Sequence, residues 1–118
     1  MKLAIIGGRN FDKWNLFEDN FLIHYQYRID SIDEIVSGGA IGVDSLAAEL
    51  AKIHDIKLKV FRPEYDKYPG KIAPLKRNEQ IMEYCDEVFA IWDGVSRGTA
   101  NSLGIAKKLK KNTTIIYF

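Results

Sequence analysis

Two short, wholly apolar runs constrain the fold of this chain most. Leu3–Ile6 ends at Gly7-Gly8, and Val88–Trp92 ends at Asp93-Gly94. A strand without a polar face is covered on both sides, as the central strands of parallel sheets are. The sequence therefore predicts that these two runs are neighbouring strands at the centre of a sheet.

Three further strands and four helices are expected along the rest of the chain. The other strands are predicted at Glu34–Ser37, Lys57–Phe61 and Thr113–Phe118. Apolar residues at helical spacing predict helices over 14–25, 42–53 and 73–84, and a last helix that ends near Lys110; Asp12 is the expected N-cap of the first. Lys57–Phe61 alternates polar and apolar residues, which is typical of a strand at the edge of a sheet.

Strands that alternate with helices form a parallel sheet with right-handed crossovers. With the apolar strands at the centre and the alternating strand at an edge, the strand order is 3-2-1-4-5. We therefore expect an α/β fold, a Rossmann-like three-layer sandwich with a five-stranded parallel sheet. A chain of 118 residues is expected to form a single domain, 1–118.

Composition narrows the classes of partner and site. The formal net charge of +1 argues against nucleic acid as a partner, because proteins built to hold nucleic-acid phosphates usually carry a larger basic excess. No stretch approaches the roughly 18 apolar residues that span a bilayer. Cys85 is the only cysteine, and with His24 and His54 it leaves no plausible zinc cluster. We expect a cytoplasmic protein without metal or cofactor.

The glycine-rich turn Ser37-Gly38-Gly39-Ala40 follows the second strand and leads into the next helix. Glycines let the chain turn sharply and let a ligand approach the backbone. The first N–H groups of a helix lack partners inside it, so a phosphate fits at that end. The alternative is that the two glycines only close a tight connection.

Three glycine-bearing segments end strands at the same edge of the predicted sheet. Ligands of open parallel sheets bind beyond the carboxyl ends of the strands, where the strand order reverses, here between the first and fourth strands. The G-x-G-x-x-G dinucleotide fingerprint is absent after the first strand. Arginines near these loops can add bidentate phosphate contacts. The predicted ligand-binding residues are Gly7, Gly8, Arg9, Ser37, Gly38, Gly39, Ala40, Asp44, Arg77, Asn78, Asp93, Arg97, Gly98 and Thr99.

Two polar neighbours on the third predicted helix are expected to have different roles. The apolar stripe of this helix is formed by Leu75, Ile81, Met82 and Cys85. Asn78 falls on that stripe, so we predict that it hydrogen-bonds the backbone of the Gly7–Asn10 or Ser37–Ala40 turn. Arg77 lies about 100° away, towards the margin of the stripe, and is predicted to contact the ligand.

Four ordered motifs resemble the SLOG superfamily, named after Smf/DprA and LOG proteins, and within it the small YspA-like branch. Gly7–Phe11 is similar to a G-S-R-x-F opening, and Ser37–Asp44 to S-G-G-A-x-G-x-D. Gly70–Met82 resembles G-K-x-A…R-N…M, and Arg97–Ala100 contains the final G-T-A. The resemblance implies a Rossmann-like pocket for nucleotides or nucleotide-derived ligands. Family members are often dimers, so a homodimer is left open.

One departure from the family bears on catalysis. LOG phosphoribohydrolases and nucleoside deoxyribosyltransferases carry a catalytic Glu three residues after a similar Gly-Thr, and here that position is Ser102. Cleavage of an N-glycosidic bond needs a carboxylate near the anomeric carbon. Asp93 is a weak candidate for that role and Asp44 a weaker one. A turn aspartate and a first-turn helix acid, respectively, are the structural alternatives.

The sequence therefore supports three functions of unequal weight. The leading one is binding of a nucleotide or nucleotide-derived, phosphate-bearing small molecule at the carboxyl edge of the sheet. The second is a hydrolase or transferase that acts on the N-glycosidic bond of a nucleotide, which Ser102 weakens. The third is single-stranded DNA binding, because Ser37–Asp44 also resembles DprA, and the near-neutral charge argues against it.

Overall fold

The computed structural model describes residues 1–118 and contains one five-stranded sheet in the order β3-β2-β1-β4-β5. All four strand pairs are parallel. The predicted α/β class, strand order and strand number are confirmed. The strands are β1 Lys2–Gly7, β2 Glu34–Ser37, β3 Lys57–Val60, β4 Glu87–Trp92 and β5 Asn112–Tyr117.

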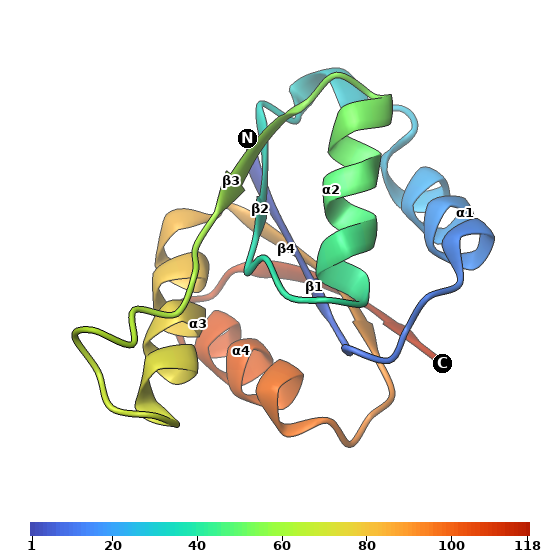
Figure 1. Cartoon of the computed structure of the whole chain (residues 1–118). Helices are drawn as coiled ribbons and strands as arrows, with labels where there is room; N and C mark the ends of the chain where they lie inside the picture. Colours follow the sequence, from blue (N-terminus) through green and yellow to red (C-terminus); the bar gives the residue numbers. More distant parts are fainter.

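Four α-helices cover the two faces of the sheet (Figure 1). α1 (Trp14–Tyr25) and α2 (Val43–Ile53) pack on one face, and α3 (Ile72–Tyr84) and α4 (Arg97–Lys108) on the other. A short 3-10 helix, Ile29–Ser31, lies between α1 and β2. No helix combines the length and the apolar character that a membrane crossing requires.

The two helical layers explain why the central strands have no polar face. Leu3 and Ile5 of β1 belong to the core under α1 and α2, whereas Ala4 and Ile6 belong to the core under α3 and α4. Residues of one strand point alternately to opposite faces, and here both faces are covered by helices. At the edge, the lysines of β3 are exposed and the residues between them are half-buried, as the alternating pattern predicted.

Two local predictions differ from the structure. Lys13, not Asp12, occupies the N-cap position of α1, and no side chain caps this helix. Leu75 does not belong to the buried face of α3, because 44% of its surface is exposed. The buried residues of α3 are Ala73, Arg77, Ile81 and Met82, so the helix is rotated relative to the predicted stripe.

Candidate ligand-binding cleft

A cleft of about 380 Å³ opens at the carboxyl ends of β1 and β4. Its walls come from the loop after β1, the β2–α2 turn, α3 and the beginning of α4. This size lies within the range of small-molecule sites. The cleft lies at the switch point that the strand order defines. The predicted site residues that line it are Gly7, Gly8, Arg9, Gly38, Ala40, Asp44, Arg77, Asn78, Gly98 and Thr99.

The glycines in the floor of the cleft allow close packing of the protein itself. A Cβ added at Gly7 would lie 2.5 Å from the carbonyl oxygen of Ile91 and 2.6 Å from Cγ2 of Val43. A Cβ at Gly38 would lie 2.6 Å from Nη1 of Arg77 and 3.1 Å from Oδ2 of Asp44. At these two positions a structural reason for glycine exists without any ligand.

Gly42 is an important residue that the predicted site did not include. It has a φ of 77°, and an added Cβ would lie 2.4 Å from the carbonyl oxygen of Gly8 and 2.5 Å from that of Arg9. The next residue, Val43, donates its backbone N–H to Gly8 O at 3.2 Å. Gly42 therefore lets the loop after β1 lie against the start of α2. Gly42 is the third glycine of the Ser37–Asp44 motif, and this position in the motif could have indicated its importance from the sequence.

The hydrogen bond to the β2–α2 turn that was predicted for Asn78 is made by Arg77. Arg77 is buried, with 8% of its surface exposed, and its Nη1 donates to the carbonyl oxygen of Gly38 at 2.7 Å. Its Nε donates to Oδ1 of Asn78 at 3.0 Å. Burial lowers the pKa of Arg77; the charge of Asp44 raises it in part, and the smaller effect of Arg9 lowers it. Arg77, not Asn78, thus holds the β2–α2 turn, while Asn78 is a half-buried side chain of the cleft wall.

Asp44 is the acidic residue of the cleft lining. Its Oδ2 accepts a hydrogen bond from the N–H of Ala40 at 3.0 Å. Burial raises the pKa of Asp44, while the Ala40 N–H and the charge of Arg77 act in the opposite direction. Asp44 therefore combines a position in the cleft with an environment that disfavours its charged form.

Asp93 does not line the cleft. Its Oδ1 accepts the N–H groups of Val95 and Ser96 at 2.9 and 2.7 Å, and its Oδ2 accepts the hydroxyl of Ser96 at 2.8 Å. These donors lower its pKa. Asp93 is thus a turn aspartate that shapes the entry to α4, and of the two carboxylates considered for catalysis Asp44 is the one in the cleft.

The beginning of α4 forms one wall of the cleft. Gly98, Thr99 and Ser102 line this wall, and Ser102 is buried. The first backbone bond of the helix runs from Ala100 N–H to Ser96 O, so the N–H groups before it lack intrahelical partners. A Cβ added at Gly98 meets no atom within 4 Å, which shows that the wall is open there.

Four predicted residues lie outside the cleft lining. Asp93 lies in the turn before α4, and Arg97 is exposed at the first position of α4. The hydroxyl of Ser37, a buried residue, accepts the N–H of Gly39 at 3.3 Å. Gly39 has a φ of 72° and lines a second, adjoining cavity. The Ser37–Ala40 turn, which was predicted to contact a ligand at one site, therefore borders two cavities.

Comparison of the sequence with known proteins gives a partial match. No protein family in a family scan matches the chain. The uncharacterized SPbeta prophage-derived protein YoqJ of Bacillus subtilis (strain 168) is 39% identical over 54 residues, with 38% of this chain and 32% of YoqJ covered.

Two solved structures are similar over nearly the whole chain. DNA processing protein A (DprA) from Helicobacter pylori, solved for its single-stranded DNA binding mode, has a TM-score of 0.73 and 22% identity. DprA from Streptococcus pneumoniae has a TM-score of 0.76 and 20% identity. They cover 98% and 99% of this chain, which spans 64% and 50% of theirs. The chain therefore has the Rossmann-like fold that is found within DprA.

Proposed function

We propose that this chain binds a nucleotide or nucleotide-derived, phosphate-bearing small molecule in the cleft. The observation that carries the proposal is the convergence of the β1 loop, the β2–α2 turn and the start of α4 on one cavity at the switch point. Backbone N–H groups at a helix start and glycine turns suit a phosphate. The resemblance to the YspA-like branch of the SLOG superfamily supports the same ligand class.

The charges around the cleft also favour an anion. Arg9 and Arg77 both line it, and they lie near enough for the charge of Arg9 to lower the pKa of Arg77. A phosphate between two like charges would relieve this repulsion, and guanidinium groups can contact it in a bidentate manner. Asp44, whose burial raises its pKa, opposes the anion only to the extent that it is ionised.

Binding is favoured over bond cleavage by the side chain at position 102. Ser102 contributes a hydroxyl to the cleft wall where N-glycosidic bond chemistry would use a carboxylate. The remaining carboxyl group, Asp44, is engaged by the N–H of Ala40.

Gly98→Val tests the proposed site directly. The added side chain would project into open space, so we expect the variant to fold with a stability change within about 0.5 kcal/mol. A thermal-shift screen of nucleotides and nucleotide sugars first identifies a ligand of the wild type. The affinity of Gly98→Val for this ligand should be at least tenfold lower. Gly104→Ala on an exposed turn of α4 is the control. Unchanged affinity in Gly98→Val would place the ligand elsewhere.

The pH dependence of binding should report on Asp44. Because the pKa of Asp44 is raised above its ordinary value of 3.8, its carboxyl is neutral over a wider acidic range. The affinity for an anion should therefore rise as the pH is lowered through the raised pKa of Asp44. Titrations with a phosphodiester ligand avoid protonation of the phosphate itself. The Asp44→Asn variant should bind the anion more tightly than the wild type at neutral pH, and its affinity should not change with pH. If the affinity of both proteins changes equally with pH, Asp44 is not the cause of the pH dependence.

Single-stranded DNA binding is the second candidate. It is favoured by the similarity in fold to DprA from Helicobacter pylori, which binds single-stranded DNA. The net charge of +1 leaves little general attraction for a polyanion. A test is titration with an oligonucleotide at several salt concentrations, where a steep loss of affinity with salt would support this candidate.

A further inference from the structure

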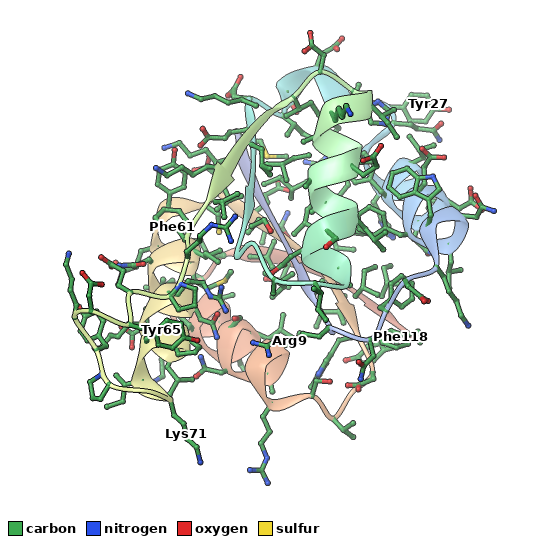
Figure 2. All side chains as sticks on the ribbon, in the orientation of Figure 1. Arg9, Tyr27, Phe61, Tyr65, Lys71 and Phe118 are labelled. Carbon is green, nitrogen blue, oxygen red and sulfur yellow. The ribbon has the colours of Figure 1, made fainter.

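A second cavity, of about 520 Å³, opens beside the cleft. Part of its lining comes from the segment that connects β3 to α3, and three arginines line it together with Tyr65 and residues 38–41. The three arginines are Arg9, Arg62 and Arg77. Figure 2 shows Arg9 and Tyr65 on the same side of the molecule.

The two cavities have a common wall. Arg9, Gly38, Ala40 and Arg77 line both of them. The two cavities therefore adjoin at the β2–α2 turn. Each cavity by itself has the volume of a small-molecule site.

The second cavity is more strongly cationic than the cleft, since no carboxylate lines it. The nearby Glu64 is paired with Lys67 at 3.0 Å and accepts a hydrogen bond from Gln80 of α3 at 2.9 Å. Arg62 makes a single long hydrogen bond, from Nη1 to Gly39 O at 3.4 Å. A guanidinium group has five N–H donors, so most donors of Arg62 are available to a ligand.

We propose that the ligand is a dinucleotide, a free small molecule in which two nucleosides are joined through phosphate. This inference rests on the proposed function and extends it. The linking phosphate lies at the common wall, where Arg9 and Arg77 face both cavities. One nucleoside occupies the cleft and the other the second cavity, where Arg62 contacts phosphate or ribose. Tyr65, 63% exposed, supplies a ring on which the second base stacks.

The experiment compares two probe sets by isothermal titration: nucleoside 5′-monophosphates and the linear 5′-phosphorylated dinucleotides of the same four bases. We expect the best dinucleotide to bind at least tenfold more tightly than its mononucleotide. Arg62→Ala and Tyr65→Ala should each weaken dinucleotide binding at least tenfold and change mononucleotide binding less than twofold. Lys71→Ala is the charge-matched control, because Lys71 is an exposed residue of the same segment that lines neither cavity. Its side chain points away from Arg9 and Tyr65 (Figure 2).

The outcomes separate this inference from the proposed function. Equal affinity for mononucleotide and dinucleotide, or equal effects of Arg62→Ala and Lys71→Ala, would overturn the dinucleotide and leave mononucleotide binding in place. If the wild type binds neither probe set, both proposals fail. An octanucleotide that binds more than tenfold tighter than the dinucleotide would assign the second cavity to a nucleic-acid strand. Thermal unfolding of each variant within about 2 °C of the wild type confirms that binding, not folding, is compared.

Discussion

Gly42→Ala is expected to lower the free energy of unfolding by about 4 kcal/mol, a large part of the stability of a domain of this size. Gly42 has φ 77° and ψ −130°, a region in which a side chain is strained. The new Cβ would also lie 2.4 and 2.5 Å from the carbonyl oxygens of Gly8 and Arg9. Both obstacles are backbone atoms, so a rotamer change cannot relieve the contact.

Urea unfolding of Gly42→Ala and Gly104→Ala provides the measurement. Gly104 lies on an exposed turn inside α4, and its added Cβ meets no atom within 4 Å. The same substitution should therefore stabilise α4 by about 0.5–1 kcal/mol. The two changes have opposite expected signs. A Gly42→Ala variant as stable as the wild type would mean that the β1 loop moves freely relative to α2.

The sheet order could be predicted because it depends on a property of each strand alone. Leu3–Ile6 and Val88–Trp92 have no polar face, which in a parallel sheet requires a helical layer on both sides. Lys57–Val60 alternates, which requires an edge. The place where the strand order reverses then follows from topology, and ten of the fourteen predicted site residues line the cleft there.

The orientation of Arg77 could not be predicted from apolar residues alone. The buried face of α3 contains Ala73, Arg77 and Ile81, spaced four residues apart, but an arginine in such a row is normally assigned to solvent. It is buried because the carbonyl oxygen of Gly38, 39 residues earlier in the chain, accepts its hydrogen bond. Such a partner is supplied only by the tertiary structure.

The second cavity was equally inaccessible to sequence reasoning. The segment from Arg62 to Lys71 has no periodicity, so nothing in it predicts which side chains face the protein. In the structure Glu64 is engaged with Lys67 and Gln80. Arg62 meanwhile lies against the β2–α2 turn, with Nη1 3.4 Å from Gly39 O. Only this arrangement distinguishes Arg62 from an ordinary surface arginine.

Arg77→Ala is expected to lower the free energy of unfolding by about 2–3 kcal/mol and to abolish measurable ligand binding. The change removes the donor to Gly38 O at 2.7 Å and leaves a buried carbonyl without its partner. It also removes the positive charge that favours the ionised form of Asp44, and it removes a side chain that lines both cavities. Asn78→Ala removes only the acceptor for Nε of Arg77, at 3.0 Å on a half-buried side chain. Its expected cost in stability is about 0.5–1 kcal/mol.

Arg77→Lys separates the two functions of this residue. A lysine keeps a positive charge near the cleft but has no planar fork, so it cannot contact Gly38 O and a phosphate in the same way. We expect Arg77→Lys to recover part of the stability lost in Arg77→Ala while ligand affinity stays at least tenfold below that of the wild type. Chemical unfolding and ligand titration on the Ala, Lys and Asn78→Ala variants measure both quantities. If Asn78→Ala proved the more destabilised protein, the hydrogen bond from Arg77 to Gly38 would not be what holds the β2–α2 turn.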